Sequence, residues 1–521
     1  MQTASQQLPD DIQALKEILL FERTLSAQKD ARIDELTEQY QQILEQFRLA
    51  QQRQFGQSSE ASTDQLGLFN ETEQIMAEGN DEAEAEQETI SYTRKKPKRK
   101  PLPEYLPRER IVHDIAESEK TCDGCGHDLH QMGEDKNEQL KFIPASIKVI
   151  EHIRPKYSCR HCEQQGTEVT IKIAPVPVAP IPKSIATASL LAQIITSKYQ
   201  YALPLYRQES LFKQYGIELS RQTMADWMIR SSELLMPIYQ RLKAMQLQQN
   251  VIHADETPLK VIHEDKSRCY MWVYCTGTDS PGDYPDHPPN IVLYDYQASR
   301  SGQCARDYLG RYNGYLQVDG YQAYDQTEAT LVGCFAHARR KFIEAQRLQP
   351  KGKTGKADWA VNHIRKLYRI ETAIKGKSPQ HRQTIRQQQA GPLLEQFKTW
   401  LDKSALQVPP KSAVGKAIAY SLGQWKKLER YREDGNLSID NNRAERAIKP
   451  FVIGRKNWLF SNTASGAQAS ATLYSLIETA KANGLIPFDY IKHLLDELPK
   501  QPDSIDHLLP WHVDLTQQAN T

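Results

Sequence analysis

Apolar and polar positions alternate along the first sixty residues at the spacing of a long helix. Three positions in the middle of the run are polar, which leaves two packing modes open: an amphipathic helix on its own domain, or a coiled coil between two chains. We therefore predict a leucine-zipper-like helix over residues 1–60. Steps of three and four residues, the heptad steps, separate Leu15, Leu19, Glu22, Ser26, Lys29, Ile33, Leu36, Tyr40, Ile43 and Phe47.

A second helical pattern runs from about residue 184 to residue 247, after a proline-rich boundary. A helix over 205–214, a turn at Gly216 and a helix capped by Ser220 have the spacing of a helix-turn-helix, an element that reads DNA. An ordinary helical hairpin is the alternative. Its packing residues would be Leu211, Phe212, Ile217, Leu219 and Trp227.

After residue 250 the pattern changes from helical to extended. β-Branched and aromatic residues cluster in short runs between turn-forming stretches. A helix over 301–309 interrupts the strands, and a basic helix follows the last of them, so the order predicts a mixed α/β sheet. The predicted strands are 251–254, 259–262, 269–276, 291–296, 315–318 and 331–334.

Length and composition describe a multidomain globular protein. A chain of 521 residues is too long for one core and predicts about three domains. Hydrophobic residues make up 39 % and the mean hydropathy is −0.64, and we find neither a membrane span nor a signal peptide, so we expect a cytoplasmic protein. Lys and Arg (66) balance Asp and Glu (65), so net charge does not indicate a partner.

Charge is nevertheless segregated after the first helix. Residues 71–88 contain eight acidic side chains and almost nothing apolar, which predicts a disordered linker. Prolines exclude a helix from the basic stretch that follows, so we expect an extended cationic arm suited to nucleic-acid phosphates. A merely solvated charge run is the alternative. The basic residues are Arg94, Lys95, Lys96, Lys98, Arg99 and Lys100.

Two CxxC pairs, Cys122 with Cys125 and Cys159 with Cys162, predict a structural zinc site. Four thiolates close a tetrahedral shell and leave no position for water, so the ion would hold a fold and not catalyse a reaction. The 33 residues between the pairs exceed the usual ribbon spacing, so we expect a small sheet there with a strand at 148–153.

Three carboxylates form the candidate metal site. Asp255 ends the first predicted strand and Asp319 a later one, and carboxylates at neighbouring strand ends can share divalent cations. Glu445, in a helix that begins near Asp440 or Ser438, is the candidate third ligand. Each acid alone is most often a solvated group or a cap, so the prediction depends on the three together.

Five segments resemble the bacterial insertion sequence 66 family of transposases. They are His253–Pro258 (HADETP), Val318–Tyr324 (VDGYQAY), Gly333–Phe342 (GCFAHARRKF), Asp440–Arg446 (DNNRAER) and Gly454–Phe460 (GRKNWLF). The resemblance covers nearly the whole chain, because the segment Phe55–Glu60, the arm at Pro101, both CxxC pairs and the tail near Gly484 also fit.

This resemblance implies an RNase H-like catalytic core with the acidic triad Asp255, Asp319 and Glu445. The long separation between the second and third acids implies a helical insertion. The expected layout is a zipper-like helix at 1–60, a linker and basic arm at 61–110, a zinc module at 111–175, a helical region at 176–250, the core at 251–345 and 436–470, the insertion at 346–435 and a helical tail at 471–521.

The implied activity is that of a DDE transposase, in which two Mg²⁺ or Mn²⁺ ions serve phosphodiester hydrolysis at the element ends and strand transfer to target DNA. The implied partners are double-stranded DNA, a second copy of the chain or a higher oligomer, and accessory proteins encoded by the same element, with the protein associated with the nucleoid when bound. A degenerate, DNA-binding repressor and an RNase H-like nuclease without strand transfer are the alternatives.

Basic residues near the triad in sequence are expected to neutralise DNA phosphates. Cys334 and His337 resemble the C-x-x-H signature of many transposases, for which we expect a structural or DNA-end-contacting role. Trp458 and Phe460 would stack on unpaired bases or, alternatively, anchor the last element. Besides the arm, the predicted DNA contacts are His337, Arg339, Arg340, Lys341, Arg443, Arg446, Lys449, Arg455, Lys456 and Trp458.

Overall fold

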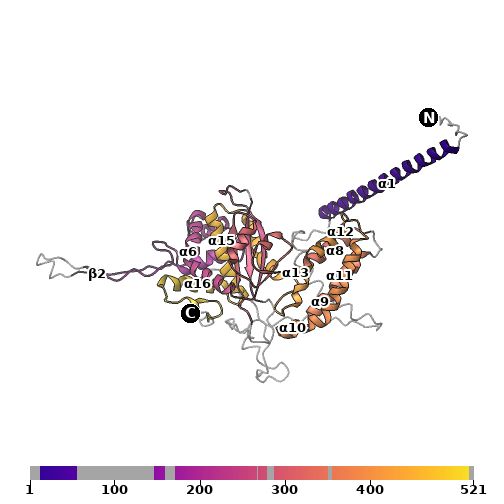
Figure 1. Cartoon of the computed structure of the whole chain (residues 1–521). Coiled ribbons are helices and arrows are strands. Elements are labelled where there is room, and N and C mark those ends of the chain that lie inside the picture. Colours follow the sequence, from indigo (N-terminus) through magenta and orange to yellow (C-terminus); the bar gives the residue numbers. More distant parts are fainter. Residues whose placement is uncertain are drawn as a thin grey trace, which may run out of the picture. The chain divides into compact units, whose positions relative to one another are not determined.

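The computed structural model describes residues 12–55, 146–158, 171–266, 268–277, 287–349 and 355–515 (Figure 1). The chain splits into two compact units, Glu84–Pro177 and the rest. The acidic linker, the cationic arm and the four cysteines of the CxxC pairs lie outside the described residues. None of the helices in the described ranges is long and apolar enough to cross a membrane.

The predicted N-terminal helix is confirmed as α1, Ile12–Phe55, a single helix of 44 residues. At about 1.5 Å per residue it is roughly 66 Å long. Apolar side chains of the heptad pattern are exposed on it, among them Leu19, Ile33, Leu36, Tyr40 and Ile43.

In the unit Glu84–Pro177 the described residues form one antiparallel pair, β1 (Lys156–Ser158) with β2 (Ile171–Ile173). The strand predicted at 148–153 is wrong, because those residues have no strand conformation. Val149 and Ile153, two β-branched residues of this segment, are 96 % and 77 % exposed. β-Branching favours a strand only where a neighbouring strand pairs with it, and no described strand pairs with this segment.

The mixed sheet predicted after residue 250 is confirmed. Its order is β5-β4-β3-β6-β7, with β3, β4 and β5 antiparallel and β6 and β7 parallel to β3. The strands are β3 (Val251–Leu259), β4 (Cys269–Cys275), β5 (Val292–Gln297), β6 (Tyr315–Gln317) and β7 (Thr330–Val332).

The strand predicted at 251–254 continues to Leu259 as β3, and of the strand predicted at 259–262 only Leu259 is in a strand, which corrects both expectations. Pro258 lies where β3 is paired with β4 on one side only, since β6 pairs only with residues 251–253. Proline is tolerated where no ladder partner needs its missing N–H. Val261 makes only an isolated bridge to Ser461.

Each face of the sheet packs against helices. Met271 and Val273 of β4 face a large core, and Trp272 and Tyr274, which alternate with them, face a smaller one with α7 (Gly302–Leu309). The helices of the large core are α4 (Ala188–Tyr199), α5 (Leu205–Gln214), α6 (Arg221–Gln246), α14 (Asn442–Trp458), α15 (Ala464–Ala482) and α16 (Pro487–Glu497).

The helices predicted around residues 205–230 are confirmed as α5 and α6. The Ser220 hydroxyl accepts the Thr223 N–H and caps α6, and Gly216 makes the turn at φ +76°. Phe212 and Trp227 are buried in the large core, so this hairpin is part of its packing. Its DNA-reading role stays a prediction.

A group of helices lies in the sequence between α8 (Phe335–Arg347) and α14, and we call it the α9–α13 bundle. With α8 it has its own hydrophobic core, which includes Phe342, Leu367 and Phe397, and its members lie together beside the sheet (Figure 1). The bundle comprises α9 (Lys356–Ala373), α10 (Pro379–Ile385), the π-helical turn η4 (Arg386–Ala390), α11 (Gly391–Ala405), α12 (Ala413–Gly423), α13 (Trp425–Glu429) and the 3₁₀ turn η5 (Arg430–Arg432).

Candidate active site

Asp255 and Asp319 lie side by side at the sheet. β3 and β6 run parallel, with His253 opposite Gln317. Asp255 lies two residues after His253, and Asp319 lies two residues after Gln317. Ile252 and Ala254 point into the smaller core, so alternation directs Asp255 to the opposite face, where α14 lies. The sheet register therefore brings two carboxylates from distant sequence positions together.

Glu445 in the first turn of α14 completes the group. Its side chain is 1 % exposed, and neither carboxylate oxygen has a hydrogen-bond partner. Burial raises the pKa of Glu445 to about 7, with the charges of Asp440 and Asp319 adding to the effect and Arg340 opposing it. A buried carboxylate without a donor is costly unless a cation neutralises it.

The charge of Asp319 acts on both other acids, because it raises the pKa values of Asp255 and Glu445. Burial raises the pKa of Asp255 well above its ordinary value, and the charges of Glu256, Glu445 and Asp319 raise it further. Burial also raises the pKa of Asp319, although the Tyr321 N–H donates to its Oδ1 over 2.8 Å. The site holds more negative charge than its neighbours compensate, which fits hard divalent cations with oxygen ligands.

A fourth carboxylate, Glu256, has a different environment, and the sequence prediction missed it. Its side chain is 1 % exposed, accepts from the Arg300 guanidinium at 2.5 and 2.9 Å and accepts from the Tyr324 hydroxyl at 2.6 Å. Because it is neutralised by Arg300, it is a less suitable metal ligand than Glu445. The available signal was its place beside Asp255 in the HADETP segment.

The C-x-x-H residues contact the third acid. Cys334 precedes α8, and its sulfur accepts the Asn441 N–H over 3.2 Å. His337 Nδ1 lies 3.5 Å from Glu445 Oε1, and the ligand atoms of Cys334, His337 and Glu445 all lie within 4.8 Å of one another. This thiol, imidazole and carboxylate set could hold one soft ion. Burial lowers the pKa of His337 to about 3, so its imidazole is neutral.

Asn441, the residue before α14, ties the helix to the sheet. Its amide donates to the Ala254 carbonyl over 2.8 Å, and its Oδ1 lies 3.2 Å from His253 Nδ1. These contacts fix the start of α14 next to the strand that carries Asp255. Sequence reasoning proposed a cap at Asp440 or Ser438, whereas Asn441 occupies the N-cap position.

Family models match most of this chain. The model for the transposase IS66 family covers residues 183–469, which include all three acids. The chain belongs to the IS66 family of transposases. Further models match residues 119–163 (zinc-finger binding domain of transposase IS66), 42–111 (transposase C of IS166 homeodomain) and 475–511 (IS66 C-terminal element).

Similar curated proteins come from Sinorhizobium fredii. Uncharacterized protein y4jD is 35 % identical over 429 residues, 79 % of this chain and 81 % of that protein. Uncharacterized protein y4qI is 30 % identical over 544 aligned residues, 97 % of each chain. No solved structure matches the chain.

The IS66 zinc-finger match contains Cys122, Cys125, Cys159 and Cys162, in agreement with a structural zinc module. These cysteines lie outside the described residues, so their role as the four ligands stays a prediction. The basic arm, predicted at Lys95, Lys96, Lys98, Arg99 and Lys100, also lies outside them.

Two predicted DNA contacts of the IS66 domain are buried arginines. Arg443 is 9 % exposed and donates to the Thr276 carbonyl over 2.9 Å, and Arg339 is 7 % exposed. Burial makes a direct phosphate contact by either residue less favourable than one by an exposed cation. The structure therefore explains Arg443 as a link between α14 and the end of β4.

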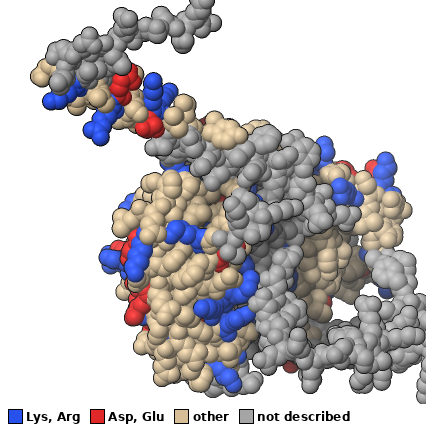
Figure 2. Space-filling view, turned by 90° about the vertical axis from the view of Figure 1, so that its right-hand side faces the viewer, with Lys and Arg blue, Asp and Glu red and all other residues tan. Residues whose placement is uncertain are grey.

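The remaining predicted cations are more accessible. Figure 2 shows lysine and arginine side chains grouped in patches on the face that carries the α9–α13 bundle. Arg446 and Lys456 are exposed, and the partly exposed ones are Arg340, Lys341, Lys449 and Arg455. Arg455 donates to the Thr257 hydroxyl over 3.1 Å, two residues from Asp255.

Trp458 packs in the protein interior, as in the alternative that it anchors the last element. Its ring contacts that of Phe451 with a centroid distance of 5.5 Å, and it packs against the large core. Phe460 is 43 % exposed and Leu459 is 65 % exposed. Of the aromatic pair, Phe460 is the better candidate for contact with a base.

Proposed function

We propose that this chain is a metal-dependent DNA transposase whose catalytic residues are Asp255, Asp319 and Glu445. One observation supports the proposal: in the parallel register of β3 and β6 the two aspartates follow paired residues, and α14 adds a buried glutamate whose oxygens accept no hydrogen bond. The strand order, three antiparallel strands followed by two that are parallel to the first, supports an RNase H-like core.

In this proposal the three carboxylates hold two Mg²⁺ or Mn²⁺ ions. Such ions activate a water or a 3′-hydroxyl and stabilise the leaving oxygen of the phosphodiester. Arg340, whose charge lowers the pKa values of both Asp319 and Glu445, offsets the negative charge of the site. The imidazole of His337, which contacts Glu445, is neutral and therefore does not compete with a metal ion for the charge of that carboxylate.

The proposed reaction begins with hydrolysis at the ends of the mobile element, which frees 3′-hydroxyls. Each of these hydroxyls then attacks a phosphorus of the target DNA at the same carboxylates. A new phosphodiester forms as the target's own P–O3′ bond breaks and leaves a target 3′-hydroxyl, with no covalent enzyme intermediate. The zinc module, the basic arm and the exposed cations near α14 would hold the DNA. A second copy of the chain would join through α1, since its apolar heptad residues are exposed.

The experiment is nicking of supercoiled DNA in the presence of Mn²⁺ by the wild-type chain, Asp319→Ala and the control Asp307→Asn. Asp307 is an exposed residue of α7 that contacts Gln303 on the same helix. We expect nicking by the wild type and the control and none by Asp319→Ala. Equal nicking by all three would refute the triad.

Product analysis separates the alternatives to transposition. Nicked products without joined products would mean a nuclease, and DNA binding without nicking would mean a repressor. Joined products that depend on Asp319 would establish strand transfer.

A further inference from the structure

The segment that delivers Glu445 is an irregular connection between the α9–α13 bundle and α14. Residues 433–441 contain no helix or strand, and α14 begins directly after them. An irregular segment fixes a side chain only where other groups hold its backbone. The contacts of this connection therefore decide how exactly Glu445 is placed.

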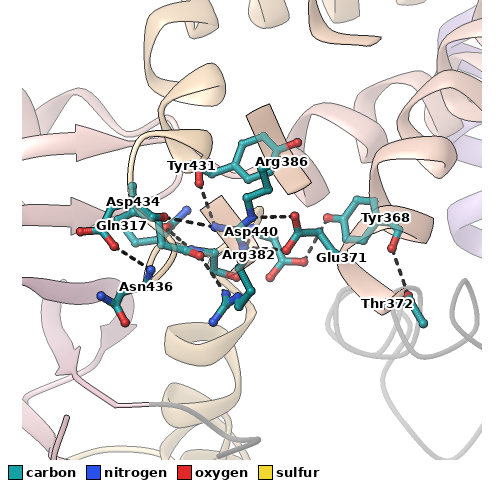
Figure 3. A network of polar contacts seen from close by, with 12 residues as sticks. Gln317, Tyr368, Glu371, Thr372, Arg382, Arg386, Tyr431, Asp434, Asn436 and Asp440 are labelled. Atoms are coloured by element: carbon teal, nitrogen blue, oxygen red, sulfur yellow. Dashed lines mark hydrogen bonds and ion pairs between the residues drawn. The ribbon is translucent and has the colours of Figure 1, made fainter. Parts of the chain in front are cut away.

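A buried arginine of the bundle holds the first half of the connection. Arg386, fully buried in η4, pairs with both carboxylate oxygens of Glu371 at 2.8 and 2.6 Å. Its remaining nitrogen donates to the carbonyls of Tyr431 (2.9 Å) and Asp434 (3.2 Å). Figure 3 shows this guanidinium between the α9 carboxylate and the backbone of the connection.

A tyrosine of α9 holds the second half. The Tyr368 hydroxyl donates to Asp440 Oδ2 over 3.0 Å, and both side chains are buried (Figure 3). The same carboxylate accepts the backbone N–H of Asn442 at Oδ1 and its amide at Oδ2. Asp440 thus transmits the position of α9 to the first residue of α14, one helical turn before Glu445.

The sheet holds the connection from the other side. Gln317 accepts the Ser438 N–H over 3.4 Å and donates to the Gly333 carbonyl over 2.7 Å. Asn441 binds the backbone of β3, as described above. The start of α14 is therefore held between the two strands that lead to the aspartates and the bundle.

We propose that the α9–α13 bundle is a positioning element for the active site, in which Tyr368 and Arg386 fix the connection and thereby aim Glu445 at the two aspartates. This inference rests on the proposed function. In this proposal Tyr368 and Arg386 contact neither DNA nor metal. They act through Asp440 and the backbone of the connection. A displacement of about 1 Å at a reacting group costs on the order of 100-fold in rate.

The test compares two full-length variants that each remove one buried hydroxyl. Tyr368→Phe loses the contact to Asp440, and the control Tyr490→Phe, in α16, loses a 2.9 Å contact to the carbonyl of Leu508. Three quantities are measured: the Mn²⁺-dependent nicking rate at saturating DNA, the Mn²⁺ concentration at half-maximal rate and Tm. A structural role alone would change Tm without changing the Mn²⁺ requirement.

We expect Tyr368→Phe to lower the nicking rate by about 10-fold or more and to raise the Mn²⁺ midpoint, with DNA binding unchanged. Tyr490→Phe should keep the wild-type nicking rate and Mn²⁺ midpoint, even if it lowers Tm as much as Tyr368→Phe does. Asp440→Asn keeps a side chain that can bond to both Tyr368 and Asn442, so it should retain more activity than Asp440→Ala.

Two results would overturn the inference: an unchanged rate and Mn²⁺ midpoint in Tyr368→Phe, or equal losses in Tyr368→Phe and Tyr490→Phe. Either result, with Asp319→Ala still inactive, would leave the proposed function intact. Equal nicking by the wild type and Asp319→Ala would instead contradict the proposed function itself.

Discussion

Among the described residues, Glu445 has the clearest functional signature. A glutamate that is 1 % exposed, with no hydrogen bond to either oxygen and two further acids nearby, is a poor stabiliser of a fold. A buried carboxylate with a strongly raised pKa is typical of functional sites, where it binds a ligand. Glu256 shows the contrast, because Arg300 and Tyr324 satisfy it.

The raised pKa of Glu445 predicts a pH-dependent metal requirement. With a pKa of about 7, the carboxylate is protonated at lower pH and protons compete with the metal. The Mn²⁺ concentration for half-maximal nicking should therefore rise as the pH is lowered from about 8 to about 6. A midpoint that stays constant over this range would contradict a protonatable ligand.

The same pKa predicts how stability depends on pH. A carboxyl group whose pKa is higher in the folded chain favours folding at low pH, and this contribution is lost as pH rises through about 7. Without added divalent metal, Glu445→Gln should therefore melt above the wild type at pH of about 8, by a few degrees. An unchanged or lower Tm would mean that the buried charge is compensated.

Among the elements, the sheet was largely predictable from the sequence and the connection before α14 was not. Runs of β-branched and aromatic residues located β4, β5, β6 and β7 because such runs are local features of the sequence. The extension of β3 past residue 254 to Leu259 depends on its pairing with β4, which a local pattern does not contain. Bonds such as Tyr368 to Asp440 join residues 72 apart and leave no local pattern.

The Arg386–Glu371 pair gives a stability prediction at the scale of elements. Removing one partner of a buried ion pair costs about 3–5 kcal/mol, and replacing both with apolar residues costs less. Arg386→Met should therefore lower the free energy of unfolding more than the double variant with Glu371→Leu. Denaturant titration checks this, and a double variant that is less stable than Arg386→Met would contradict it.

At the scale of the whole molecule, the chain combines an exposed zipper-like helix, a zinc-finger match and an IS66 transposase domain. The triad was predicted from strand ends and family resemblance. Asp319 follows the end of β6, but the prediction for Asp255 was wrong in that this residue lies within β3, which continues to Leu259 because β4 pairs with it there. The role of the α9–α13 bundle could not be predicted from the sequence, because its apolar pattern predicts only that the helices pack.

The proposed pairing of two DNA ends requires at least two catalytic chains, and we propose α1, whose apolar heptad residues are exposed, as their interface. Leu19→Glu with Leu36→Glu should convert a dimer to a monomer in sedimentation velocity at low micromolar concentration, because buried heptad charges disrupt a coiled coil. The exposed polar position Gln28→Glu serves as the control. A wild-type monomer, or an unchanged dimer in the double variant, would exclude this interface.

The central claim is that Glu445 acts with the two aspartates at one metal-dependent site. The most direct measurement is Mn²⁺-dependent nicking by Glu445→Gln beside Glu478→Gln, a second buried glutamate, which pairs with Lys481 in α15. Both substitutions keep the shape of the side chain and remove a buried charge. We expect no nicking by Glu445→Gln and wild-type nicking by Glu478→Gln. Wild-type nicking by Glu445→Gln would contradict it.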